Sequence, residues 1–387
     1  VKLCKKIGCE PYICTNAGSG TQEDMSDWVE YCNLKDQGFW AKNRISNGYK
    51  EPHGIKYWSI GNENYGAWEI GAWTSSQWGL LVKEAAKMIL KVDSTIQLSA
   101  AALTDPSWNY NLLKEAGQYL RWISVHGYWA GSNDSYEHIM TLTEDAISDR
   151  IDQSRATLVS MGLEKKIKIS FDEWNLRFWY HPRSLESFYT DEPLTEDDII
   201  TPRNLNDKNS IYTMSDAIFS ACFLNTCLKN CDIIGMACFS PVVNTRGAIF
   251  THKDGIVLRP TYYVFDLFSN YLKSTVLNSW RIDSEKISFE DRGKVSEINA
   301  IDAVATYKDG EFAISAVNRD KDYSHILELD MTDTPVKEMR IHTLNGDSAD
   351  SYNDIDRTEV SVKTTEWKPF EPVIKLEAHS VNVIEIR

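Results

Sequence analysis

Two glutamates stand out because each follows a short β-rich run and lies beside asparagine and tryptophan. Glu63 ends the run YWSIGNE at 57–63, and Glu173 lies in the run ISFDEWN at 169–175. Cleaving a glycosidic bond takes two such carboxyls, one to protonate the leaving oxygen and one to attack the anomeric carbon. A lone acid at a strand end more often caps a helix or pairs with arginine. Two acids at matching strand ends favour catalysis.

Other polar residues near these runs leave some of the catalytic assignments undecided. Asp172 competes with Glu173 for the same role, because strand alternation does not settle which side chain points inward. His126 and Tyr128 end the neighbouring strand, where the phenol could hydrogen-bond Glu173 and keep it ionised. On its own, a histidine like His126 is more often part of the core. His126, His138 and Asp172 lack metal-ligand spacing, so neither a metal nor a cofactor is predicted.

Short strands alternating with amphipathic helices must position these acids. Six strands are predicted, at 11–14, 56–60, 95–101, 122–126, 167–171 and 233–239, with helical stripes at 78–89, 147–159 and 211–228. Strict alternation implies parallel strands, and catalytic groups of an α/β barrel lie where its strands end. Residues 3–7 indicate the end of a helix closed by Gly8. We therefore predict an α/β fold, a (β/α)8 TIM barrel with its first strands missing, over 1–274. An open doubly wound sheet is the alternative, although no glycine-rich phosphate loop follows a strand.

The pattern changes after residue 275. Short, partly alternating runs at 304–307, 312–317, 326–329, 360–362 and 381–386 are separated by Asp, Gly, Asn and Pro. Such runs are typical of antiparallel strands joined by turns. We predict a C-terminal antiparallel β-sandwich over 275–387.

Composition narrows the class of partner. The net charge of −15 argues against binding to nucleic acid or to an anionic membrane, and no apolar run is long enough to cross a bilayer. The opening VKLCKK is no signal peptide; because its first residue is not Met, we expect the true N-terminus to lie earlier. The eight cysteines form no Cys-x-x-Cys pair and favour free thiols, which points towards the cytoplasm.

The two glutamate runs resemble the acid/base and nucleophile motifs of glycoside hydrolase family 51, chiefly α-L-arabinofuranosidases. Further similarity lies in NAGSGT at 16–21, WVEYCN at 28–33, HGY at 126–128, the runs DA at 216–217 and FLN at 223–225, and VN at 243–244. The resemblance runs over essentially the whole chain. It implies a barrel with a β-sandwich and a retaining, two-step release of terminal α-L-arabinofuranosyl residues from arabinan, arabinoxylan or their oligosaccharides. A homo-oligomer is also compatible with it.

The resemblance assigns a role to each matching residue. Glu63 is implied as the general acid/base and Glu173 as the nucleophile that forms the covalent intermediate. Asn62 is implied to bind the sugar 2-hydroxyl, His126 and Tyr128 to line the site, and Trp68 to form part of its wall.

Two departures leave alternatives open. The family's earlier strands are missing, and SPVVN at 240–244 lacks the Gln that usually precedes Val-Asn. A related retaining barrel enzyme, such as an endoglucanase or β-xylosidase, is the main alternative. A noncatalytic carbohydrate-binding relative and a fragment without independent function are the others.

Overall fold

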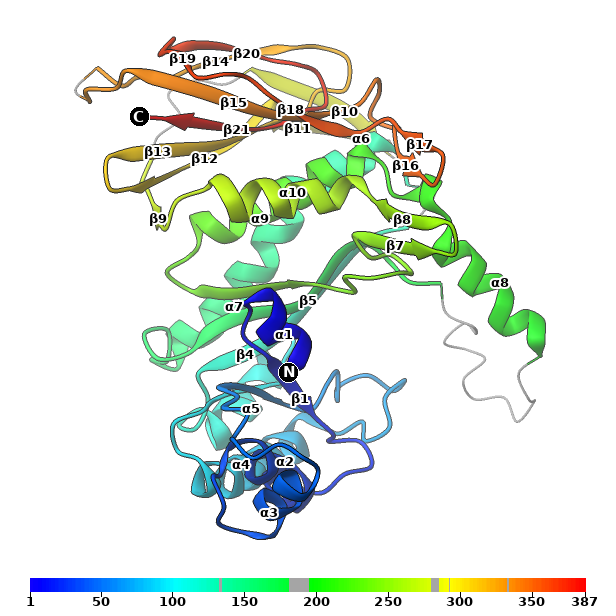
Figure 1. The fold of residues 1–387 in the computed structure, drawn as a ribbon, viewed down its shortest axis with the longest axis vertical. Helices are drawn as coiled ribbons and strands as arrows, with labels where there is room; N and C mark the ends of the chain where they lie inside the picture. The colour runs from blue at the N-terminus through cyan, green and yellow to red at the C-terminus, as the bar shows by residue number, and fades with distance from the viewer. Residues whose placement is uncertain (132–133, 181–194, 280–284, 292, 333) are drawn as a thin grey trace. The chain divides into compact units, whose positions relative to one another are not determined.

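The computed structural model describes residues 1–131, 134–180, 195–279, 285–291, 293–332 and 334–387. Its chain divides into two compact units (Figure 1). The first unit comprises Val1–His126, Arg150–Asp172 and Asp232–Met236, and the second comprises Gly127–Asp149, Glu173–Cys231 and Ala237–Arg387. Within the described residues, no helix is both long and apolar enough to span a bilayer.

The first unit alternates strands and helices as predicted. Strands β1, β2 and β3 pair in parallel, and a parallel bridge between Ala101 and Ser124 follows β3. The elements are α1 (Lys2–Ile7), β1 (Tyr12–Thr15), α2 (Gln22–Asn33), α3 (Phe39–Ser46), β2 (Tyr57–Ile60), α4 (Ser75–Val92), β3 (Gln97–Ala100) and α5 (Pro106–Ala116).

Helix α4 illustrates how the sequence specifies these elements. The side chain of Thr74 accepts a hydrogen bond from the Gln77 backbone amide, and the Gln77 side-chain oxygen accepts one from the Thr74 backbone amide, which completes the predicted capping box. The helix then buries one face, formed by Trp78, Gly79, Val82, Ala85, Ala86 and Ile89. Trp78, Val82, Ala85 and Ile89 belong to the predicted stripe, whereas its remaining member, Leu81, is only half-buried. The stripe lies on the same face because these residues recur at helical spacing.

Another three-stranded sheet has the order β4–β5–β6. The boundary between the two units falls within each of its strands. They are β4 (Trp122–Ala130), β5 (Lys168–Arg177) and β6 (Ile234–Phe239); helix α7 (Ile147–Ser160) lies between β4 and β5 in sequence. Strands β4 and β5 are longer than predicted, so Glu173 lies within β5 and not beyond its end. Backbone hydrogen bonds extend past the predicted ends of these strands: the Trp174 carbonyl accepts from the Ser240 amide, and the Ala130 carbonyl accepts from the Phe178 amide.

The second unit contains the antiparallel C-terminal sheets. Its main sheet follows the order β18–β15–β21–β13–β12–β9, with β19 beside β15. The strands are β7 (Ile249–His252), β8 (Gly255–Leu258), β9 (Thr275–Val276), β10 (Lys286–Asp291), β11 (Lys294–Asn299), β12 (Ile301–Lys308), β13 (Glu311–Asn318), β14 (His325–Glu328), β15 (Glu338–Asn345), β16 (Asn353–Asp354), β17 (Arg357–Thr358), β18 (Ser361–Thr364), β19 (Lys368–Pro369), β20 (Val373–Leu376) and β21 (Val381–Ile386).

Helices of the same unit pack against this sheet (Figure 1). Helix α9 (Met214–Lys229) contacts β12 and β13, and α10 (Pro260–Tyr271) contacts β15, β18 and β21. The unit also contains α6 (Tyr136–Thr141), the π-helical turn η1 (Leu142–Ala146), α8 (Glu196–Asp207) and the 3-10 turn η3 (Asn209–Ile211). An apolar cluster combines side chains of the main sheet with two of β20; its members are Ile314, Ala316, Met339, Ile374, Leu376, Ile384 and Ile386.

A buried arginine joins the sheet to η1. The Arg319 guanidinium lies 2.6 Å from Glu144 Oε1 and donates to the Asn299 carbonyl and the Thr143 hydroxyl. Its side chain is 1% exposed, whereas that of Glu144 is 32% exposed. Removing the cation would leave a half-buried carboxylate without its ion pair.

We predict that Arg319→Met lowers the free energy of unfolding by roughly 3 kcal/mol, the lower end expected for a broken buried ion pair. Urea denaturation followed by tryptophan fluorescence measures the loss. Lys321→Met is the matched control, because it breaks the more exposed pair with Glu137 and should cost under about 1 kcal/mol. Equal losses in the two variants would contradict this interpretation.

Candidate active site

A tight turn after β2 sets the backbone of Glu63. Gly61 has φ 69°, and a Cβ there would lie 2.1 Å from Asn64 Oδ1 and 2.5 Å from the Trp78 ring. Only glycine fits this position without displacement. Glu63 itself has φ 45°, a left-handed conformation that is uncommon for a residue with a side chain. Such backbone strain concentrates at functional sites, where surrounding contacts hold it in place.

Three donors surround the Glu63 carboxylate. His126 Nδ1 lies 2.7 Å from Oε1, the Tyr65 hydroxyl donates to Oε1 at 3.2 Å, and Trp68 Nε1 donates to Oε2 at 2.7 Å. The Glu63 side chain is 18% exposed. Burial raises its pKa, but hydrogen bonding and charge from His126, with the Trp68 and Tyr65 hydrogen bonds, outweigh burial and lower the pKa overall.

Asp172 and Glu173 are adjacent in β5 but have different partners. Asp172 accepts a hydrogen bond from the Tyr12 hydroxyl at 2.7 Å, and its Oδ1 lies 3.6 Å from His126 Nε2. Its side chain is 8% exposed, and burial raises the pKa of its carboxyl despite the nearby His126, Tyr12 and Ser124. Asp172 therefore belongs to the Glu63 group in the first unit.

Glu173 belongs to the second unit and contacts Tyr128. The Tyr128 hydroxyl donates a short hydrogen bond to Glu173 Oε1, which confirms the predicted contact between phenol and carboxylate. Burial raises the pKa of this phenol well above its ordinary value although the Arg246 charge opposes the rise, so the hydroxyl stays a donor at neutral pH. The Arg246 guanidinium stacks on the Tyr128 ring at 4.1 Å from its centroid. Arg246 is 4% exposed, so this cation is fixed beside the tyrosine.

Two residues with predicted binding roles have exposed side chains. The Asn62 amide donates to Glu69 Oε1 at 3.3 Å, and the Trp68 ring is 43% exposed. Trp68 therefore combines an accessible aromatic face with its hydrogen bond to Glu63. The roles of these residues towards a sugar stay predictions.

Sequence reasoning missed Tyr12, Tyr65 and Arg246. Tyr12 begins the short apolar strand β1 and has the sequence signal of a core residue. Tyr65 lies only two residues after Glu63, which was the available signal for it. Arg246 is distant in sequence from Tyr128, and nothing in the sequence connects the two.

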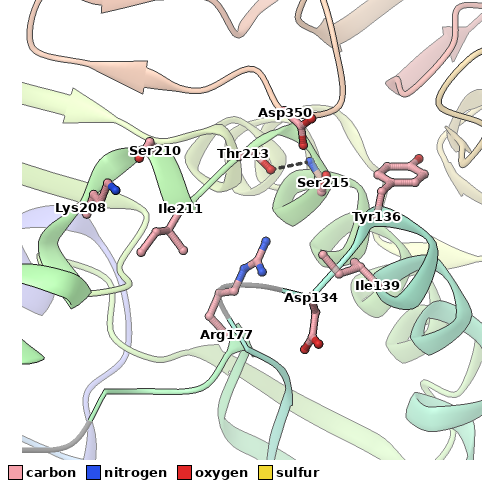
Figure 2. Close-up of a pocket in the computed structure, with 10 residues that line it drawn as sticks. All are labelled: Asp134, Tyr136, Ile139, Arg177, Lys208, Ser210, Ile211, Thr213, Ser215 and Asp350. Atoms are coloured by element: carbon pink, nitrogen blue, oxygen red, sulfur yellow. Dashed lines mark hydrogen bonds between the residues drawn. The ribbon is translucent and has the colours of Figure 1, made fainter. Parts of the chain in front are cut away.

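A separate cavity of about 300 Å³ lies in the second unit (Figure 2). Arg177 points into it, but its guanidinium makes a two-pronged ion pair with Asp216 at 2.8 and 2.9 Å and donates to the Gly131 carbonyl. Asp134, Lys208, Asp350 and six other residues complete the lining, which does not include Glu173 or Tyr128. The charge of Arg177 is therefore already compensated by Asp216 within the cavity wall.

Comparison with known proteins agrees with the motifs. Residues 1–146 match the family model described as the α-L-arabinofuranosidase 1 domain, and residues 172–380 match that of the α-L-arabinofuranosidase C-terminal domain. The chain belongs to glycoside hydrolase family 51, the α-L-arabinofuranosidases. This confirms the resemblance and the glycoside hydrolase class inferred from the sequence.

Individual relatives are similar over nearly the whole chain. An intracellular exo-α-(1→5)-L-arabinofuranosidase of Acetivibrio thermocellus is 30% identical, and the alignment covers 100% of this chain and 78% of the relative. A Halalkalibacterium halodurans enzyme of the same description is 31% identical over 86% of this chain and 66% of its own length. The crystal structure of Thermotoga maritima α-L-arabinofuranosidase, an arabinose complex, has a TM-score of 0.84 at 28% identity and covers 99% of this chain and 77% of that one.

We predict that Trp68→Phe raises the pKa of Glu63, because it keeps the ring but removes the N–H donated to Oε2. Carbon-13 NMR titration of the glutamate carboxyls, with the Glu63 signal assigned by its loss in Glu63→Gln, measures the shift. Trp73→Phe, at an exposed tryptophan of the same segment, is the control. An unchanged titration in Trp68→Phe would contradict the contribution of this hydrogen bond.

Proposed function

We propose that this family 51 chain hydrolyses terminal α-L-arabinofuranosyl residues of arabinan, arabinoxylan or derived oligosaccharides by double displacement. The main support is that Glu63 and Glu173, the acids of its two family motifs, each accept hydrogen bonds from buried or ring-bearing donors. The relatives described as exo-acting on α-(1→5)-linked arabinofuranosides support the same substrate class.

The proposed roles follow from what each carboxyl contacts. Glu173 attacks the anomeric carbon and forms the covalent arabinosyl intermediate, while the Tyr128 hydroxyl orients its Oε1. Glu63 protonates the departing oxygen and then removes a proton from the water that hydrolyses the intermediate. Asn62 binds the sugar 2-hydroxyl, His126 and Tyr128 line the sugar site, and Trp68 contributes to its wall.

We also propose the organisation that the sequence predicted. The six strands form part of a (β/α)8 barrel over domain 1–274. The C-terminal domain is a β-sandwich over 275–387. The relatives described as intracellular support a cytoplasmic location, and the family resemblance supports a homo-oligomer, which sedimentation would test.

We predict that the protein with the first strands of its barrel included hydrolyses 4-nitrophenyl α-L-arabinofuranoside. Glu173→Ala should lower turnover by several orders of magnitude. Azide should restore the Glu173→Ala variant and give an arabinosyl azide of inverted configuration, because the small anion attacks the substrate directly. Azide should restore Glu63→Ala with retained configuration, because it then attacks the covalent intermediate. Proton NMR of the products distinguishes the two.

Glu115→Gln is a matched control, since Glu115 pairs with Lys83 between α4 and α5 and should leave turnover unchanged. Turnover of glucan or xylan substrates but not of the arabinofuranoside would indicate the endoglucanase or β-xylosidase alternative. Binding that persists in Glu173→Gln, with no turnover of any of these substrates by the unsubstituted protein, would indicate a noncatalytic carbohydrate-binding protein.

We predict that Tyr128→Phe lowers kcat about tenfold to a hundredfold, because the nucleophile loses a charge-assisted hydrogen bond of roughly 1.5–3 kcal/mol. The ring that Arg246 covers is kept, so the fold should be unchanged. Steady-state kinetics on the same arabinofuranoside give the loss, with Tyr110→Phe at an exposed helical site as the control. A change confined to KM would contradict a role through the nucleophile.

A further inference from the structure

A chain of polar contacts extends inward from Glu63. His126 Nδ1 lies 2.7 Å from Glu63 Oε1, and the opposite ring nitrogen, Nε2, lies 3.6 Å from Asp172 Oδ1. The Tyr12 hydroxyl donates to the other Asp172 oxygen at 2.7 Å. All four residues belong to the first unit. One imidazole is therefore placed between two carboxyl groups.

Asp172 is a costly group to keep in this position. Its side chain is 8% exposed, and within the described part of the chain its Oδ1 accepts no hydrogen bond. His126 is the basic side chain found within 4 Å of its carboxyl, at 3.6 Å, and no lysine or arginine pair is seen for it among the described residues. A buried carboxylate is expensive unless a cation compensates it, so the pairing favours the charged form of His126.

The other groups around the imidazole act on that charge in both directions, because the Arg150 cation opposes it and the Ser124 hydroxyl can accept a hydrogen bond from Nε2. The Ser124 hydroxyl lies 3.4 Å from Nε2, and the Arg150 guanidinium donates to the backbone carbonyl of His126 at 3.1 Å. Tyr65 and Trp68 direct their donors to Glu63. Burial and the charge of Asp172 raise the pKa of Tyr12 well above its ordinary value, so this phenol stays a neutral donor.

We propose that His126 stores the proton that Glu63 delivers to the leaving oxygen, and that Asp172 is a positioning residue that holds this proton on the imidazole. The proposal rests on the acid/base role given to Glu63 above. It also reconciles that role with the contacts of Glu63, which favour a carboxylate in the resting protein, whereas the first step needs a carboxylic acid.

The proton balance closes over one catalytic cycle. In the resting state Glu63 is ionised and His126 carries protons on both ring nitrogens. The Nδ1 proton moves to Glu63 and then to the glycosidic oxygen, which keeps the electron pair of the broken bond. Loss of that proton leaves His126 neutral, with its other proton on Nε2, the nitrogen on the Asp172 side of the ring. When water attacks the covalent intermediate, Glu63 takes a proton from it and returns that proton to Nδ1.

The pH dependence follows from the charges. The pair formed by Glu63 and His126 loses its stored proton as pH rises, so the alkaline limb of kcat/KM reports that loss. The negative charge of Asp172 raises the pKa for this loss, because an opposite charge at this range favours the imidazolium. Removing the charge should move the alkaline limb to lower pH.

The test compares the pH dependence of kcat/KM in Asp172→Asn and Tyr12→Phe, both made in the protein with the first strands of its barrel included. We expect Asp172→Asn to move the alkaline limb down by about one to three pH units on an arabino-oligosaccharide, whose leaving group needs protonation. Tyr12→Phe should move it in the same direction by less than about one unit, since it only weakens the ionised form of Asp172. A substrate with a dinitrophenolate leaving group, which needs no proton, should show no such shift.

Nitrogen-15 NMR of the imidazole, without substrate, measures the same proton directly, with the His126 signal assigned by its loss in His126→Gln. We expect unsubstituted His126 to remain charged above about pH 7 and its titration to fall in Asp172→Asn. Asp232→Asn is the matched control, because Asp232 pairs with Arg155 at an exposed site and should change neither readout. Circular dichroism checks that each variant is folded.

The outcomes separate this proposal from the proposed function. Absence of turnover on every arabinofuranoside would overturn the function, while the NMR titration would still decide the protonation of His126. If His126 titrates near about pH 6.5 and Asp172→Asn leaves it there, the proton store is refuted even in an active enzyme. A lower kcat in Asp172→Asn with an unmoved alkaline limb would also overturn it and leave Asp172 a purely structural role.

Discussion

The contact between His126 Nδ1 and Glu63 Oε1 is the interaction on which the arrangement of the first unit's polar groups depends. A carboxyl with 18% of its side chain exposed would ordinarily have a raised pKa. Here the imidazole, with help from Trp68 and Tyr65, reverses the effect of burial. The opposite nitrogen of the same imidazole lies 3.6 Å from the buried Asp172. Loss of this one ring would remove a polar neighbour from both carboxyl groups, so neither acid can be considered apart from it.

The backbone contributes to the same end. Glu63 has φ 45° directly after Gly61 and Asn62, and this turn redirects the chain as soon as β2 ends at Ile60. Strain of this kind costs about 1–3 kcal/mol and persists only where neighbouring contacts determine the conformation. Three side-chain donors and the hydrogen bond from the Gly66 amide to the Glu63 carbonyl do so here. The buried side chains of Trp58 and Ile60 stabilise strand β2. This stability offsets the strain of the turn that orients the Glu63 carboxyl.

Much of the fold was predictable because it follows from local periodicity. The capping box and apolar stripe of α4 and the six short strands are read from neighbouring residues alone. Strand β15 (EMRIHTLN) was missed because Arg340 and His342 interrupt its apolar pattern. Both side chains contact Glu385 of the adjacent strand β21, and a pattern-based prediction cannot anticipate charged residues that compensate each other across a sheet. The lengths of β4 and β5 were underestimated for a related reason, since polar groups such as Asn175 and Arg177 are buried there with partners distant in sequence.

The candidate site shows the same division between local and long-range information. Glu63, Glu173 and Tyr128 could be named from the sequence because strand ends and motif runs mark them. The different roles of Asp172 and Glu173 could not be predicted from the sequence, because both residues are acidic, adjacent and part of one strand. Their chemistry is set by partners at sequence separations of 45 to 160 residues, Tyr128 for one and Tyr12 for the other. A carboxylate that accepts a hydrogen bond beside a fixed arginine–tyrosine stack is suited to attack, whereas one enclosed with an imidazole is suited to hold a proton in place. Two neighbouring acids can therefore divide the work of a reaction without any difference in their own side-chain chemistry.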